Sequence, residues 1–207
     1  MNNKLIDKNN ISYYILDNNA EVLAAEVIAN AFQFWFNYML DFFPECSNNK
    51  CSVIAFDSNA NLPIGAVISR DFYSTINTNI DQRFSHCKPM LAILNQLDNN
   101  YIKLKGEIKP YQIMDLWLGG VIPNEEYMKR GIAKEMSRLA INLIKNQKYM
   151  YCVAECTGYY SQKIMQSVGF SEITKIKYRD FKYNNTNIFS EIPQPHDYLI
   201  FYEILCK

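Results

Sequence analysis

Long apolar segments are missing from this sequence. No run approaches the roughly 18–20 apolar residues that a helix needs to span a bilayer. The amino end, Met1 to Lys4, has no apolar stretch followed by a small-residue cleavage site, so no secretory signal is expected. An excess of one charge is also missing, because 21 basic residues balance 21 acidic ones. We therefore expect neither a membrane nor a nucleic acid as partner.

Recognisable metal and nucleotide motifs are absent as well. The six cysteines include no C-x-x-C pair and no zinc-type spacing with the two histidines. Neither the dinucleotide fingerprint G-x-G-x-x-G nor the P-loop G-x-x-x-x-G-K-[ST] occurs. We therefore expect no bound metal, and thiols that stay reduced in a cytoplasmic protein.

The chain also lacks a Gly-, Ser- or Pro-rich linker and an internal repeat, either of which would indicate a second domain. Its 207 residues, 49% of them apolar, suit one domain with one sizeable core. Residues 1–207 are accordingly expected to form a single domain.

The clearest organisation lies between residues 111 and 170. An apolar strand over 113–122 ends at Pro123-Asn124, a turn signal that a strand interior does not tolerate. A helix follows, with apolar residues at i, i+4, i+7 and i+11, namely Ile132, Met136, Leu139 and Leu143. A second strand over 149–154 completes a parallel strand–helix–strand unit. Further strands are predicted at 11–16, 52–57, 63–69, 172–182 and 198–205, and further helices at 20–32, 88–97 and 158–168.

The start of the central helix has the features of an anion site. The first turn of a helix leaves about four N–H groups unpaired and carries roughly half a positive charge. Gly131 has no side chain, so an anion can approach the backbone closely there. Lys129 and Arg130 add two positive charges beside it. A pyrophosphate is the ligand that such a start suits best.

These residues carry a resemblance to a known family. Met128-Lys129-Arg130-Gly131-Ile132-Ala133 resembles the [QR]-x-x-G-x-[GA] signature of the GNAT superfamily of acyl-CoA-dependent N-acyltransferases. Downstream, 161–170 resembles the family's second helix, which closes with Gly-Phe. Residues 154–158 with Ser161-Gln162 are most similar to the arylalkylamine N-acetyltransferase-like branch. Met128 departs from the Gln or Arg of the signature, and Met165 stands where many members have Tyr.

The resemblance implies a fold, a cosubstrate and a place for it. The fold is an α/β (α+β) mixed sheet of about seven strands flanked by helices, with a central parallel βαβ unit. Acetyl-CoA is the implied cosubstrate, and no metal is implied. Its contacts would come from Val121, Ile122, Met128, Lys129, Arg130, Gly131, Ile132, Ala133 and Gly158. In residues 71–109 apolar and polar residues do not alternate regularly. We interpret this segment as an insertion on the side of the amine acceptor.

N-acyl transfer needs a base for the amine, because an alkylammonium has no lone pair with which to attack. Asp115 and Glu155 are the candidates, since each lies on a central strand where an unpaired carboxylate is costly to bury. By the period of two, Asp115 shares a strand face with Trp117 and Val121. The alternative for both carboxylates is structural hydrogen bonding. Ser161 either protonates the leaving thiolate or caps its helix.

An aromatic-rich segment over 33–43 indicates a packed core element or an apolar acceptor pocket. Phe32, Trp35, Phe36 and Trp117 are the candidate acceptor residues. The favoured function is transfer of an acetyl group to a small aryl- or alkylamine, by a monomer or homodimer. A peptide or protein N-acetyltransferase is one alternative. A non-catalytic acyl-CoA-binding or sensor domain is the other, because the Glu-Pro pair of the amine-acetylating branch is missing from 33–43. His196 is expected to be peripheral.

Overall fold

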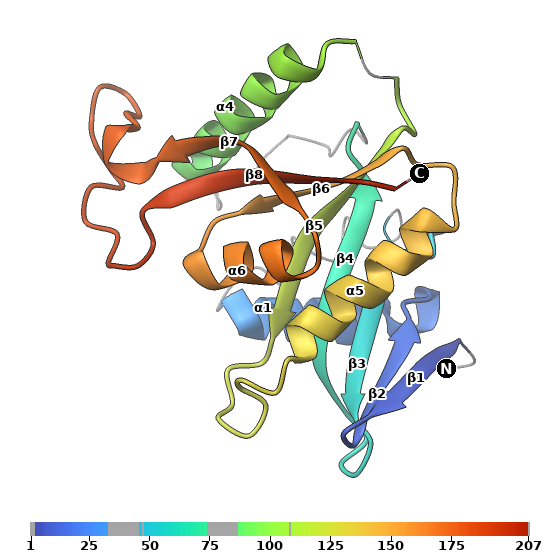
Figure 1. Ribbon diagram of the computed structural model, residues 1–207. Coiled ribbons are helices and arrows are strands. Elements are labelled where there is room, and N and C mark those ends of the chain that lie inside the picture. The colour runs from blue at the N-terminus through green and yellow to red at the C-terminus, as the bar shows by residue number, and fades with distance from the viewer. Residues whose placement is uncertain (1–2, 33–45, 47, 74–86, 108, 207) are drawn as a thin grey trace.

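A computed structural model of the chain describes residues 3–32, 46, 48–73, 87–107 and 109–206. The described part contains one eight-stranded sheet in the order β1-β2-β3-β4-β5-β6-β8-β7 (Figure 1). Its strands are β1 Lys4–Lys8, β2 Ile11–Ile15, β3 Val53–Asp57, β4 Leu62–Asp71, β5 Ile113–Val121, β6 Tyr151–Cys156, β7 Ser171–Lys177 and β8 Tyr198–Leu205. Its helices are α1 Glu21–Phe32, α4 Lys88–Lys105, α5 Ile132–Lys145 and α6 Tyr159–Ser167, with short 3₁₀ turns at Asn18–Ala20 and Tyr178–Asp180.

The sheet is mixed. The strands β5 and β6 pair in parallel, joined through α5, and the other neighbours pair antiparallel. The predicted βαβ unit and the α/β mixed sheet are thus confirmed. The expectation of about seven strands was one short, because β1 at the edge of the sheet had not been predicted.

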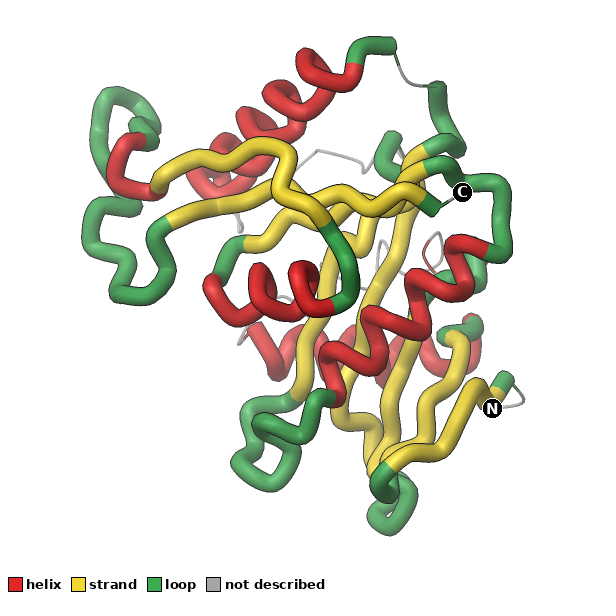
Figure 2. The backbone as a smooth tube through the Cα atoms, in the orientation of Figure 1, coloured by secondary structure: helices red, strands yellow, loops and turns green. Residues whose placement is uncertain are grey.

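Two layers of helices cover the sheet. Figure 2 shows α5 and α6 in front of the strands, with α1 behind them. The buried side chains agree with this arrangement, because α5 and α6 share one core cluster with alternate strand residues. The helices α1 and α4 form two further clusters with the residues in between, such as Ile54 for α1 and Phe201 for α4. The sheet therefore separates an α5/α6 face from an α1/α4 face.

Helix α5 packs on the sheet through the apolar stripe that its sequence predicts. Ile132, Met136 and Leu139 are buried, and Leu143 is partly buried. The helix approaches the sheet closely at Gly65 of β4, where an added Cβ would lie 2.8 Å from Met136 Cε. This contact fixes the start of α5 beside the end of β5.

Helix α4 is longer than predicted. It continues from Lys88 to Lys105 and ends at Gly106, whose φ of +80° suits glycine. Ile93, Leu97 and Tyr101 are fully buried against β7 and β8. The segment 71–109, interpreted as an insertion, thus contributes a core-packing helix to the α1/α4 face.

A β-bulge in β5 corrects one inference from the sequence. Ser69 of β4 pairs with Leu116, whereas the preceding Ile68 pairs with Leu118, so Trp117 is an extra residue in β5. The extra residue reverses the alternation of side chains. Asp115 and Trp117 remain on the α1/α4 face, but Val121 packs into the α5/α6 core. The expectation that Asp115 and Val121 share a face was wrong for this reason.

The described helices include none that is long and apolar enough to cross a bilayer. The six cysteine side chains are all buried thiols. Burial raises the pKa of Cys51 and of Cys156 to about 12, so both thiols are protonated at neutral pH.

Candidate active site

The two central parallel strands separate after a short stretch of pairing. Their pairs run from Ile113–Tyr151 to Asp115–Val153 and then stop, although β5 continues to Val121 and β6 to Cys156. On its other edge β6 stays paired with β8 as far as Cys156. The backbone of β5 beyond Asp115 therefore faces an opening, and not a neighbouring strand, on its β6 side.

Backbone N–H groups of β5 point into this opening. Ile122 donates its N–H to Ile64 O at 2.9 Å, on the β4 side. Because backbone groups alternate between the two edges of a strand, the N–H of Val121 points to the β6 side. This is the kind of donor that an oxyanion formed between the strands needs.

The loop after β5 is held against the sheet. The carbonyl of Asn124 accepts hydrogen bonds from the N–H groups of Tyr127 and Met128 at 3.0 and 3.1 Å. The Tyr127 ring is buried, and its hydroxyl donates to Asp57 Oδ2 at 3.1 Å. The loop thus presents a fixed backbone to the start of α5, while Met128 is 57% exposed.

Helix α5 begins at Gly131, the N-cap residue, whose φ is +75°. No side chain among the described residues caps this start, and a Cβ added at Gly131 would have nothing within 4 Å. Ile132 is buried and Ala133 is partly buried, so these two residues offer backbone N–H groups to a ligand and not side chains. The open space and the unpaired N–H groups fit a pyrophosphate.

The two cations of this loop, Lys129 and Arg130, differ in their surroundings. Arg130 donates to Asn9 O at 2.7 Å and thereby ties the loop to the β1–β2 turn. Lys129 has a φ of +59°, a conformation that is uncommon for a residue with a side chain. Arg130 therefore holds the loop against the β1–β2 turn, and the backbone at Lys129 adopts a left-handed conformation two residues before Gly131.

Helix α6 starts beside the opening and is capped twice. Ser161 Oγ donates to Gly158 O at 2.7 Å and accepts from Gly158 N at 3.4 Å. The N–H of Tyr159 donates to His196 Nδ1 at 3.1 Å. Ser161 is thus engaged in the capping role, one of the two expected for it. His196, expected to be peripheral, binds the helix start from the loop before β8, a contact that no local sequence signal indicates.

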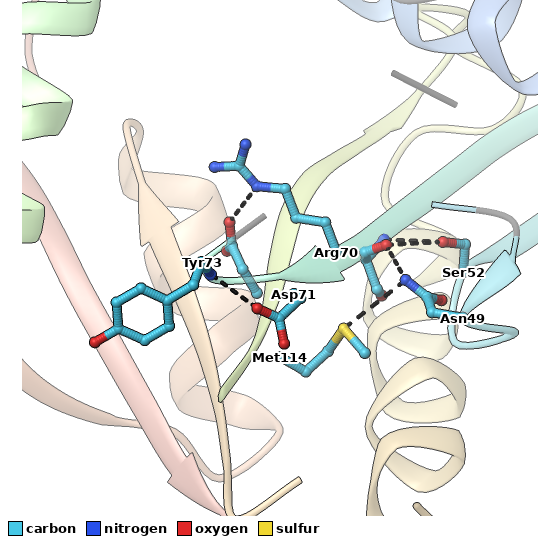
Figure 3. A network of polar contacts seen from close by, with 8 residues as sticks. Asn49, Ser52, Arg70, Asp71, Tyr73 and Met114 are labelled. Atoms are coloured by element: carbon cyan, nitrogen blue, oxygen red, sulfur yellow. Dashed lines mark hydrogen bonds and ion pairs between the residues drawn. The ribbon is translucent and has the colours of Figure 1, made fainter. Parts of the chain in front are cut away.

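The other side of the opening, on the α1/α4 face, holds a buried carboxyl cluster. Arg70 of β4 binds Asp115 of β5, with Nε 3.1 Å from Oδ2, and its guanidinium lies 4.4 Å from the centre of the Trp117 ring. Figure 3 shows Arg70 with this ion pair at the end of β4. The Asp115 side chain is 1% exposed. Asp115 and Trp117 therefore lie together, as their strand positions predict.

Two more carboxyl groups complete the cluster. Glu155 of β6 and Asp98 of α4 lie within hydrogen-bonding reach of each other, and both interact electrostatically with Asp115 and Arg70. Burial, reinforced by the neighbouring carboxylates, raises the pKa of Asp98 to about 6 and that of Glu155 well above its usual value. Within the described residues, no group of His, Cys, Asp or Glu side chains is arranged to hold a metal ion.

The sequence predicted Asp115 and Glu155 but missed Arg70 and Asp98. Asp98 follows Leu97 and precedes Tyr101 by three positions, so it borders the buried stripe of α4. An acidic residue next to the apolar stripe of a helix was the feature of the sequence that could have indicated Asp98. Of the predicted acceptor residues, Phe32 is the last residue of α1, whereas Trp35 and Phe36 lie outside the described residues.

Solved structures with the same fold were found, at low sequence identity. Arylalkylamine N-acetyltransferase 2 from Aedes aegypti has a TM-score of 0.73 at 17% identity, over 96% of this chain and 100% of that one. The C-terminal condensation domain of Ebony, in complex with beta-alanyl-dopamine, has a TM-score of 0.78 at 11% identity, over 94% and 99%. Drosophila melanogaster polyamine N-acetyltransferase, which forms N-acetylagmatine, has a TM-score of 0.72 at 12% identity, over 94% and 99%. The chain has the GNAT fold. No protein-family model and no curated protein matches its sequence.

The two motifs of the GNAT resemblance lie on the loops and helices that follow β5 and β6. The signature 128–133 forms the end of the loop and the start of α5, and the second motif forms α6 with Gly169-Phe170 behind it. Both helix starts border the separation of β5 and β6. At this low identity the structural similarity establishes the fold alone.

Proposed function

We propose that this protein is an acetyl-CoA-dependent N-acetyltransferase that acetylates a small primary amine by direct attack. One observation carries the proposal. The separation of β5 from β6 beyond Asp115–Val153 opens between an uncapped helix start on one side and buried carboxyl groups on the other. The uncapped helix start can bind the phosphates of an acyl donor. The buried carboxyl groups can take up the proton that the amine must lose.

The loop and the helix start would hold the pyrophosphate of acetyl-CoA. Backbone N–H groups at Gly131, Ile132 and Ala133 supply the donors, Lys129 supplies a cation, and Met128 borders the site. Arg130 holds the loop through Asn9. Val121, Ile122 and Gly158 line the opening through their backbone. When bound, acetyl-CoA supplies the activated acyl group.

Three further groups of the chain would act on the reacting atoms. The Val121 N–H faces the opening, where it would stabilise the negative charge on the carbonyl oxygen. Glu155 is the better candidate base, because Arg70 already neutralises Asp115. Ser161 would have to release its bond to Gly158 O before it could protonate the thiolate. We assign Asp115 a positioning role in this scheme.

The amine would enter on the α1/α4 face, which Trp117 borders and which α4 covers, and Phe32 at the end of α1 stays a candidate for this pocket. Trp35 and Phe36 remain candidates for the same pocket. Proteins with this fold act on arylalkylamines and form N-acetylagmatine. This supports a small amine, and not a peptide, as the acceptor. We further propose a cytoplasmic protein, monomeric or homodimeric.

The second candidate is an acyl-CoA sensor without catalysis. The ion pair between Arg70 and Asp115 favours it, since Arg70 holds the Asp115 carboxylate in a structural contact between β4 and β5. The sensor would use the same loop for acetyl-CoA and release no thiol.

Calorimetric titration with acetyl-CoA, followed by an assay of CoA release, tests both candidates. The amine panel contains arylalkylamines, polyamines and peptides, and Lys129→Ala serves as the variant with a weakened phosphate site. Binding with thiol release for one amine class establishes the transferase and names its substrate. Binding without release for every amine establishes the sensor. Absence of binding refutes the phosphate site.

A further inference from the structure

The carboxyl groups on the α1/α4 face form a linked set, and not two separate candidate bases. Four elements contribute to it, namely β4, α4, β5 and β6, through Arg70, Asp98, Asp115 and Glu155. No donor among the described residues hydrogen-bonds Asp98 Oδ1, Asp115 Oδ1 or Glu155 Oε1, although each of these atoms is buried. Buried carboxyl oxygens without a donor are costly, so their retention calls for a ligand or a proton.

The closeness of Asp98 and Glu155 implies that the pair holds a proton. Two carboxylates only repel each other, whereas a carboxylic acid donates to a carboxylate in a short and strong hydrogen bond. The two buried side chains lie within hydrogen-bonding reach of each other, so we infer that the pair holds one proton and one negative charge. Burial raises the pKa of Glu155 well above its usual range, which makes Glu155 the protonated partner, and Asp98, with a pKa of about 6, carries the charge at neutral pH.

The pair also lies close to the point at which β5 and β6 separate. Val153 is the last residue of β6 that pairs with β5, and Glu155 follows two residues later on the α1/α4 face, opposite Phe201 of β8. Glu155 therefore borders the opening into which the β5 backbone directs its N–H groups. Asp98 lies behind Glu155, on the helix that covers this face.

The remaining charged groups around the pair are occupied. Arg70 is bound to Asp115. On β8, Glu203 accepts from the Tyr101 hydroxyl at 2.5 Å and from Lys105 Nζ at 2.6 Å. In the part of the chain that the structure describes, no Lys or Arg side chain thus forms an ion pair with Asp98 or Glu155.

We propose that Asp98 and Glu155 act together as a proton relay that selects a primary ammonium acceptor and removes its proton. This inference rests on the proposed function, because it assigns the base of that reaction. One N–H bond of the ammonium breaks, and its proton passes to an oxygen of Glu155. The proton that Glu155 held passes to Asp98 at the same time. The amine keeps the electron pair with which it attacks, and the charge on Asp98 is neutralised.

The relay assigns a positioning role to Asp98, because this residue acts through Glu155. It also predicts a preference for acceptors that are charged at neutral pH. An alkylammonium delivers both the positive charge that the pair attracts and the proton that it accepts. An aromatic amine, uncharged at neutral pH, provides neither.

Infrared spectroscopy of the protein without ligands tests the proton directly. The wild type, Asp98→Asn, Glu155→Gln and the surface control Glu172→Gln are titrated between pH 5 and 8 in H₂O and D₂O. We expect a carboxylic-acid band in the wild type at pH 7, with a further acid group appearing around pH 6. Asp98→Asn loses the step around pH 6, and Glu155→Gln loses the band at pH 7. A wild-type spectrum without an acid band at pH 7 overturns the relay.

Acetyl transfer to the best amine of the panel provides the second readout. We expect Asp98→Asn and Glu155→Gln to lower kcat/KM by at least about 100-fold, as loss of general-base catalysis does. Their Kd for acetyl-CoA stays within twofold of that of the wild type, and Glu172→Gln changes neither quantity. Full activity in Asp98→Asn overturns the relay while the proposed function stands. A wild type that acetylates no amine overturns the proposed function, and the infrared titration then still decides whether the pair shares a proton.

Discussion

Replacing Asp98 with asparagine should stabilise the protein at alkaline pH. The folded state raises the pKa of Asp98 from 3.8 to about 6, first because burial penalises its charge and second because Asp115 lies close. Asparagine has nearly the same shape, carries no charge, and its amide oxygen can accept the hydrogen bond of the protonated Glu155. The variant therefore removes a repulsive charge and leaves the packing of α4 in place.

The pH dependence follows from the direction of this pKa change. A carboxyl group whose pKa is raised on folding favours the folded state below its unfolded pKa, and this advantage is lost as the pH rises through the folded pKa. The wild type thus loses stability between about pH 4 and pH 6 relative to the variant. A pKa of about 6 in place of 3.8 corresponds to about 3 kcal/mol above pH 6. For a chain of this size each kcal/mol raises Tm by about 2–4 °C.

Urea denaturation, followed by circular dichroism at fixed ionic strength, measures the difference from pH 4 to pH 8. We expect Asp98→Asn to equal the wild type near pH 4 and to exceed it by up to about 3 kcal/mol at pH 8. Glu172→Gln, which breaks only the exposed pair with Lys175, should change stability by less than about 0.5 kcal/mol at every pH. A difference that does not vary with pH, or a less stable Asp98→Asn at pH 8, would refute the reasoning. With the loss of activity expected above, the variant would trade function for stability.

Four substitutions near the two helix starts test the remaining assignments. Lys129→Ala should raise the Kd for acetyl-CoA several-fold, with the ratio to the wild type shrinking as salt is added; an unchanged Kd at low salt would remove Lys129 from the site. Gly131→Ala places a side chain at a φ of +75°, so calorimetry should show a lower Tm and weaker acetyl-CoA binding. Tyr127→Phe loses the bond to Asp57 and should release the loop, seen as faster amide exchange over 123–131 with the rest of the sheet unchanged. Ser161→Ala should lower the free energy of unfolding by about 1 kcal/mol through its lost cap; an acid role requires in addition a fall in kcat that stability does not explain.

The sequence by itself determined the local elements. The strand Tyr198–Leu205 was predicted with the bounds that the structure has, and the apolar stripe of α5 was predicted correctly. The loop between β5 and α5 could also be predicted, since Gly131 and its two basic neighbours are contiguous in the sequence. These features depend on residues within one or two turns of each other, so periodicity and glycine placement suffice to find them.

The tertiary structure alone decided the chemistry of the site. The bulge at Trp117 turned Val121 away from Asp115, although nothing in the alternation of β5 marks an extra residue. Asp98 and Glu155, separated by 57 positions, meet because α4 packs across the face that β6 exposes. A pKa depends on burial and on the charges that folding brings near, and neither quantity is encoded in the residues beside a carboxyl group. The sequence could therefore propose Glu155 as a base, but only the packing of α4 places Asp98 beside it.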